Sequence, residues 1–126
     1  MPGGRTRILI VEPDQFTATY IEELLTGAGF EVAGIAGSAN EALALAAEHA
    51  PQLALIDIQL AGAAGGIPLA DLLATKFDMA TIFLSDETDL ETMRRAKALR
   101  PIGFLYKPFA PSQIFNAIEI ALDASS

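Results

Sequence analysis

The chain has 126 residues, of which 52% are hydrophobic, with a formal net charge of -8 and no cysteine. This length suffices for one domain with a real core and is too short for two. The lack of cysteine excludes a disulfide framework, a thiolate metal site and a cysteine nucleophile. The acidic charge argues against a nucleic-acid surface, which needs clustered Lys and Arg. No apolar run has the length of a membrane span and the N-terminus does not resemble a signal peptide, so we expect a cytoplasmic protein.

The pattern of hydrophobic residues predicts five strands that alternate with five helices. Apolar or alternating stretches typical of strands occur at residues 7–11, 30–35, 53–57, 80–84 and 103–106. Segments with apolar residues at helical spacing occur at residues 15–28, 39–49, 67–77, 86–99 and 111–122. Strand–helix alternations joined by right-handed crossovers give a parallel sheet covered on both faces. We therefore predict a doubly wound, five-stranded α/β sandwich of flavodoxin-like type.

Spacing assigns residues to the faces and ends of three of these helices. The inner face of the first is expected to carry Phe16, Tyr20, Ile21, Leu24 and Leu25. The second begins after Ser38, and Glu41 three residues later completes the pattern of a capping box. The third is expected to turn Leu69, Leu72 and Leu73 inward.

Several other residues are interpreted without a role in a functional site. His49 stands alone at the end of a predicted helix and is expected to be a capping or surface residue. A basic cluster on the helix before the last strand predicts a solvated face, with an acidic partner as the alternative; it comprises Arg94, Arg95, Lys97 and Arg100. Four aromatic residues near the C-terminus fit either a core or a docking surface; these are Phe104, Tyr106, Phe109 and Phe115.

Polar residues follow or end four of the predicted strands: Glu12, Asp57, Ser85 and Lys107. Taken alone, Asp57 could equally cap or turn the chain. Because ligands collect at the carboxyl ends of parallel strands, we expect the four side chains to converge. Two carboxylates suit a hard cation such as Mg²⁺, and Asp57 could attack phosphorus to form an acyl phosphate. Lys107 would counter the added charge, and Ser85 would hydrogen-bond a phosphoryl oxygen.

With these residues in place, the chain resembles a receiver domain of the two-component response regulators, in the CheY-like superfamily, over residues 7–122. The segments that carry the resemblance are residues 8–12, 55–60, 82–85 and 103–109. It implies one stand-alone receiver domain over residues 1–126 that accepts a phosphoryl group on Asp57 from a histidine kinase or phosphotransfer protein. Such a domain is not an enzyme beyond self-catalysed phosphotransfer and dephosphorylation. With no output domain expected after Ser126, it would signal by binding a downstream protein partner.

The resemblance also implies roles for the other residues of the site. The Mg²⁺ ligands would be the carboxylates of Glu12 and Asp57 and the backbone carbonyl of Gln59. Ser85 and Phe104 would form a switch pair that alters the face built from the last two helices and the last strand. That face is also a candidate homodimer surface. The peptide bond between Lys107 and Pro108 is typically cis in this family.

The sequence departs from the family at three positions. The family usually has two adjacent acids after the first strand, but Pro13 follows Glu12 here, so one metal ligand is missing. Asp14 is a candidate replacement, directly or through water, although its position in the first helical turn disfavours it. Asp86 follows the switch hydroxyl, where the residue is usually small; we interpret it as a helix N-cap rather than a charge that repels phosphate. Ala61 replaces a common proline and predicts a looser loop.

Two alternatives to a phosphorylated receiver remain. The first is a receiver-like interaction module that no longer depends on phosphorylation, suggested by Pro13 and Asp86. The second is an aspartate-nucleophile phosphatase of the haloacid dehalogenase type. Such enzymes need a second acid two residues after the nucleophile, and Gln59 occupies that position. We therefore rank the phosphatase far below the other two.

Overall fold

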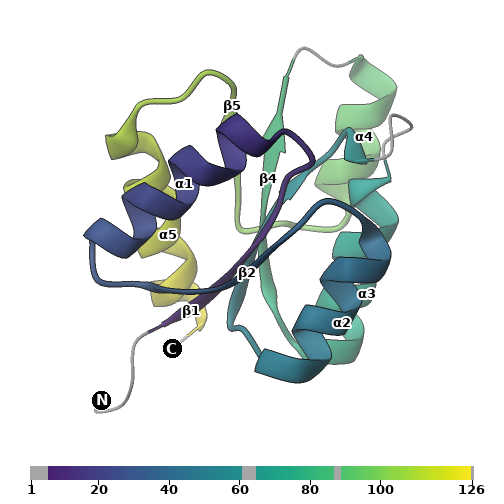
Figure 1. The fold of residues 1–126 in the computed structure, drawn as a ribbon. Coiled ribbons are helices and arrows are strands. Elements are labelled where there is room, and N and C mark those ends of the chain that lie inside the picture. Colours follow the sequence, from purple (N-terminus) through teal and green to yellow (C-terminus); the bar gives the residue numbers. More distant parts are fainter. Residues whose placement is uncertain (1–5, 61–64, 87–88, 126) are drawn as a thin grey trace.

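The computed structural model describes residues 6–60, 65–86 and 89–125, which form a parallel sheet between two layers of helices (Figure 1). The strands are β1 (Arg7–Val11), β2 (Glu31–Ala36), β3 (Leu53–Asp57), β4 (Ala80–Ser85) and β5 (Gly103–Tyr106). The helices are α1 (Gln15–Gly27), α2 (Ala39–His49), α3 (Gly66–Phe77), α4 (Leu90–Ala98) and α5 (Pro111–Ser125). All neighbouring strands pair in parallel in the order β2-β1-β3-β4-β5, which confirms the predicted fold class.

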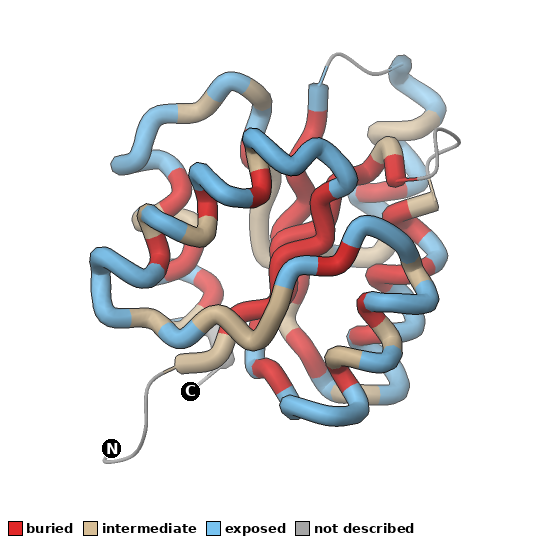
Figure 2. Tube along the Cα trace, in the orientation of Figure 1, coloured by how far each residue is buried: buried red, intermediate tan, exposed pale blue. Residues whose placement is uncertain are grey.

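The two faces of the sheet carry separate hydrophobic clusters. On β1, Leu9 and Val11 belong to the cluster that includes α2, α3 and α4, whereas Ile8 and Ile10 belong to the cluster that includes α1 and α5. The middle of the sheet is buried from both sides (Figure 2). Because every residue of β3 is buried, the strand that ends in Asp57 lies at the centre of the core. In the described ranges, no helix is both long and apolar enough to cross a membrane.

Two helix N-termini show how the sequence sets the element boundaries. At α2, the Ser38 hydroxyl accepts the Glu41 N–H at 3.2 Å, and the Glu41 carboxylate accepts the Gly37 N–H at 2.7 Å. The predicted capping residues are therefore confirmed. The hydrogen bond to the Glu41 carboxylate comes from Gly37, the residue before the N-cap. At α4, the N-cap is Asp89, whose carboxylate accepts the Thr92 N–H at 2.7 Å.

Three expectations about these helices are wrong. Phe16 is 89% exposed and Tyr20 is 41% exposed, because at about 100° per residue they lie on the side of α1 away from the buried Ala18, Ile21 and Leu25. Leu72 is 39% exposed, beside the buried Leu73 and Leu69.

The third error concerns Asp86, which does not cap α4. The helix begins at Leu90, later than expected, so the cap position belongs to Asp89. Residues 87–88, which follow Asp86, and Ala61, in the loop before α3, lie outside the described residues.

Candidate functional site

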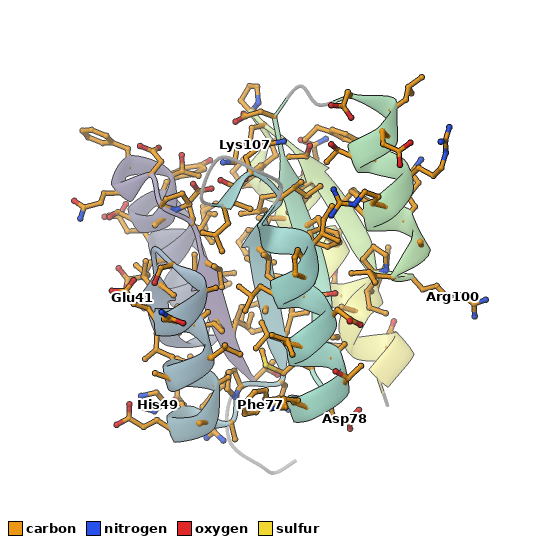
Figure 3. All side chains as sticks on the ribbon, turned by 90° about the vertical axis from the view of Figure 1, so that its right-hand side faces the viewer. Glu41, His49, Phe77, Asp78, Arg100 and Lys107 are labelled. Atoms are coloured by element: carbon orange, nitrogen blue, oxygen red, sulfur yellow. The ribbon has the colours of Figure 1, made fainter. Side chains whose placement is uncertain are left out.

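The predicted strand-end residues lie together at the carboxyl edge of the sheet. Strand pairing places Asp57 opposite Leu84, and Ser85 opposite Tyr106. The N–H of Lys107 donates to the Ser85 carbonyl at 2.8 Å, which ties the chain after β5 to the end of β4. Figure 3 shows Lys107 at the end of the sheet opposite to the labelled His49 and Phe77.

The Lys107 ammonium lies between two carboxylates. Its Nζ is 2.6 Å from Glu12 Oε1 and 3.6 Å from Asp57 Oδ2. The side chains of Glu12 and Asp57 are buried, and that of Lys107 is only 14% exposed. Buried ions remain stable only when they are paired and hydrogen-bonded, so the three groups form one charge network.

The pKa values of this network follow from burial and pairing. Burial raises the pKa of Glu12, and hydrogen bonds from the Lys107 ammonium and the Asp14 N–H oppose this effect without cancelling it. Burial lowers the pKa of Lys107, but the hydrogen bond to Glu12 and the charge of Asp57 outweigh it, so this pKa is raised. Lys107 therefore stays a cation beside the carboxylates throughout the neutral range.

The carboxylate of Asp57 is oriented by the chain that follows it. Its Oδ1 accepts the Gln59 N–H at 2.9 Å, while Oδ2 faces Lys107. The next residue, Ile58, donates its N–H to the Leu84 carbonyl at 2.9 Å. One carboxylate oxygen is thus held by the backbone and the other faces a cation.

The two predicted switch residues have well-defined contacts. The Ser85 hydroxyl is buried and donates to the Asp86 carbonyl at 2.8 Å. The half-buried ring of Phe104 lies 5.7 Å from that of Phe83 and is stacked 6.4 Å from the exposed ring of Tyr106. The hydroxyl is therefore turned to its own neighbouring backbone, and Phe104 links the core to a surface aromatic.

Asp14, the candidate replacement ligand, has a different partner. Its Oδ2 accepts the Thr17 hydroxyl at 2.6 Å and the Thr17 N–H at 3.1 Å, so it caps α1. These hydrogen bonds lower the pKa of Asp14. Pro13 is exposed and brings no oxygen to the site from its side chain. A metal-binding role for Asp14 stays a prediction, and it would require the carboxylate to leave its cap.

The donor set fits a divalent ion that keeps several of its waters. Across residues 6–60, 65–86 and 89–125, no three acidic or imidazole side chains converge as a metal cage. The buried Oε1 of Glu12 already faces a cation, the Lys107 ammonium, so it can serve a metal ion in the same way. Glu12, Asp57 and the Gln59 carbonyl would hold Mg²⁺ with several waters, since this ion dehydrates reluctantly.

A hollow beside the charge network was not predicted from the sequence. It encloses about 490 Å³ and is lined by Phe16, Thr17, Tyr20, Asp86, Lys107, Pro108 and Phe109. The rings of Tyr20 and Phe109, both in this lining, are neighbours with centroids 6.5 Å apart. The available signal is the pair of aromatic residues four apart in α1, Phe16 and Tyr20, which the sequence pattern predicts on the inner face.

The other residues considered in the sequence analysis lie outside the charge network. His49 is exposed at the end of α2, as expected for a surface residue. The basic residues of α4 are exposed, and Arg100 extends away from the body of the molecule (Figure 3). Phe109 and Phe115 are half-buried against the cluster that includes α1 and α5. The peptide bond between Lys107 and Pro108 is cis, as the resemblance implied.

Comparisons with known proteins point to one protein family. The family model described as the response regulator receiver domain matches residues 8–119. The transcriptional regulatory protein PdtaR of Mycobacterium tuberculosis is 31% identical over 116 residues, which cover 92% of this chain and 56% of PdtaR. The phyllosphere-induced regulator PhyR of Methylorubrum extorquens is 33% identical over 118 residues, covering 93% and 43%. The chain thus spans about half the length of the curated relatives it matches.

Solved structures show the same fold over nearly the whole chain. The signal receiver domain of a modulated diguanylate cyclase from Desulfovibrio desulfuricans G20 has a TM-score of 0.89 and 34% identity, covering 95% of both chains. A CheY-like response regulator receiver domain from Methanospirillum hungatei JF-1 has a TM-score of 0.87 and 28% identity, covering 96% of both chains. Together with the family match over residues 8–119, these similarities show that the chain belongs to the response regulator receiver domain family of two-component signalling.

Proposed function

We propose that this receiver domain accepts a phosphoryl group on Asp57 from a phosphohistidine of a histidine kinase or phosphotransfer protein. The observation that carries the proposal is the Lys107 ammonium between the buried carboxylates of Glu12 and Asp57. Receiver domains generally bind Mg²⁺ at an acidic site, and the two carboxylates here match that donor chemistry. Burying three charges in one network costs free energy, which favours retention for chemistry over retention for stability.

In the proposed reaction, Asp57 Oδ2 attacks phosphorus while Oδ1 remains held by the Gln59 N–H. The new O–P bond forms as the P–N bond to the donor imidazole breaks, and the electron pair stays on that nitrogen. Mg²⁺, when bound through Glu12, Asp57 and the Gln59 carbonyl, supplies positive charge to the phosphoryl oxygens. Lys107 neutralises the charge added at Asp57.

The response to phosphorylation is proposed to begin at Ser85. Its hydroxyl would exchange the Asp86 carbonyl for a phosphoryl oxygen, which is a stronger, charged acceptor. Phe104, between Phe83 and Tyr106, would then move and change the exposed face of β5 with α4 and α5. That face would bind a downstream protein partner in the cytoplasm, and pairing of two copies through it remains a second proposal.

Incubation with acetyl phosphate and Mg²⁺, followed by intact mass, tests the proposal. We expect a mass gain of one phosphoryl group on the wild type and none on Asp57→Asn. A receiver of known activity, treated in the same way, controls for the reagent. No gain on the wild type, when that receiver is modified, would contradict phosphoryl acceptance.

A second candidate is an interaction module that works without phosphorylation. It is favoured by Pro13 in place of a metal ligand and by Lys107 already balancing the charge of Glu12 at 2.6 Å. This candidate predicts that Mg²⁺ leaves the Asp57 and Gln59 resonances unchanged. It fails if Mg²⁺ shifts them clearly and if Pro13→Asp brings no further change.

A further inference from the structure

The first residue of α3 lies directly against the backbone of the phosphoryl acceptor. A side-chain carbon at Gly66 would overlap the carbonyl oxygen of Asp57, lie 2.9 Å from its carbonyl carbon and lie 3.0 Å from Ile58 Cα. All three are backbone atoms, so no change of rotamer relieves the overlap. Only a residue without a side chain allows α3 to begin so close to the end of β3.

The end of β3 cannot easily shift to make room. Ile58 donates its N–H to the Leu84 carbonyl at 2.9 Å and accepts the Gly66 N–H at 3.1 Å. The neighbouring strand and the start of α3 therefore hold the same residue from two directions. Because Ile58 and Gly66 are buried, a displaced strand end would leave these backbone groups unpaired away from water.

The same stretch of backbone orients the reactive carboxylate. Asp57 Oδ1 accepts the N–H of Gln59, so the carboxylate is oriented by the peptide two residues later. A displacement at the Asp57 carbonyl would alter both the carboxylate and the Gln59 backbone that follows. We infer that Gly66 is a positioning residue for Asp57, because its bare backbone contact fixes the chain that orients the carboxylate.

This inference rests on the proposed phosphoryl acceptance for its rate measurement, but not for its structural measurement. The test compares Gly66→Ala with Gly27→Ala. A side-chain carbon at Gly27 meets nothing within 4 Å, so Gly27→Ala controls for the loss of backbone freedom alone. For each variant, hydrogen exchange of the Gln59 amide and the rate of phosphorylation by acetyl phosphate with Mg²⁺ are measured well below the melting temperature.

In Gly66→Ala, we expect the Gln59 amide to exchange about tenfold faster than in the wild type. We also expect phosphorylation per folded molecule to slow about tenfold or more, since small misplacements of a reacting group are costly. Gly27→Ala should match the wild type in both. An excluded osmolyte such as trimethylamine N-oxide is added to all samples if Gly66→Ala is poorly folded.

A lowered melting temperature with unchanged Gln59 exchange would overturn the inference, because the role of Gly66 would then be structural only. Failure of Gly66→Ala to fold even with osmolyte, while Gly27→Ala folds, would overturn it for the same reason. If the wild type takes no phosphoryl group, the proposed function fails, yet the Gln59 exchange still decides the role of Gly66.

Discussion

The two ends of the same sheet differ in the polar residues that they bury. Among the described residues, the buried polar or charged ones are Glu12, Asp57, Ser85 and Thr81, and the first three lie at the carboxyl end. The amino end has a hollow of about 450 Å³, but the one acid that lines it, Asp78, is exposed.

The strands that join the two ends are mainly apolar along their length. Their packing therefore does not require ionised groups at either end of the sheet. Isolated charges are expensive to bury, and a paired set seldom stabilises more than hydrophobic residues of the same size. We therefore expect the buried charges concentrated at one end to serve chemistry rather than folding. Four sets of variants test this comparison.

Replacing one acid at each end of the sheet should have opposite effects on phosphoryl incorporation. Asp57→Asn removes the proposed nucleophile and should abolish phosphoryl incorporation measured by intact mass. Asp78→Asn should leave incorporation unchanged, because Asp78 is exposed at a left-handed position that Asn tolerates. Incorporation that survives in Asp57→Asn would place the acceptor elsewhere.

Lys107→Met should destabilise the protein by about 2 kcal/mol at pH 7, because two carboxylates lose their shared cation. The folded pKa of Glu12 is already raised by burial and should rise further without Lys107. A raised carboxyl pKa gives stability that is present at low pH and lost as pH rises through the folded pKa. In urea unfolding, the loss in free energy of unfolding relative to the wild type should therefore be small near pH 4 and grow toward pH 7.

The matched control for that series is Lys97→Met, on the exposed face of α4, which should change stability by less than about 0.5 kcal/mol at either pH. An equal, pH-independent loss in both lysine variants would show that Lys107 is not paired as described.

Pro13→Asp should raise Mg²⁺ affinity about tenfold, equivalent to about 1.4 kcal/mol, by adding a third carboxylate next to Glu12. Isothermal titration or amide shifts can measure the affinity. Pro13→Ala removes the proline without adding an acid and should bind Mg²⁺ like the wild type. Equal affinity in the two variants would mean that position 13 does not reach the metal.

Asp86→Ala should speed phosphorylation by acetyl phosphate about threefold at low salt, since Asp86 lines the hollow beside Lys107 and repels anionic donors. High salt should reduce the difference. Asp89→Ala should leave the rate unchanged but cost about 1 kcal/mol of stability through the lost cap of α4. Equal phosphorylation rates for the two variants would show that Asp86 does not repel the incoming phosphate donor.

The sequence predicts the fold well because its strands are short apolar runs buried on both sides, as β3 shows along its whole length. It also predicts the convergence of Glu12, Asp57 and Lys107, because parallel strands end at one edge of the sheet. Such predictions need only element order and chain direction.

Features that depend on the exact phase of a helix or on tertiary packing could not be predicted. The start of α4 is one case, because neighbouring acids make the choice between Asp86 and Asp89 as its cap ambiguous. The contact between Gly66 and the Asp57 carbonyl exists only once α3 is packed against β3.

Chemical trapping can show which side chain accepts the phosphoryl group. After treatment with acetyl phosphate and Mg²⁺, borohydride reduces an aspartyl phosphate to homoserine, which peptide mass spectrometry can locate. We expect homoserine at Asp57 in the wild type, with Glu12 and Asp14 unmodified. Modification at another acid, or none under conditions that label a second receiver, would contradict it.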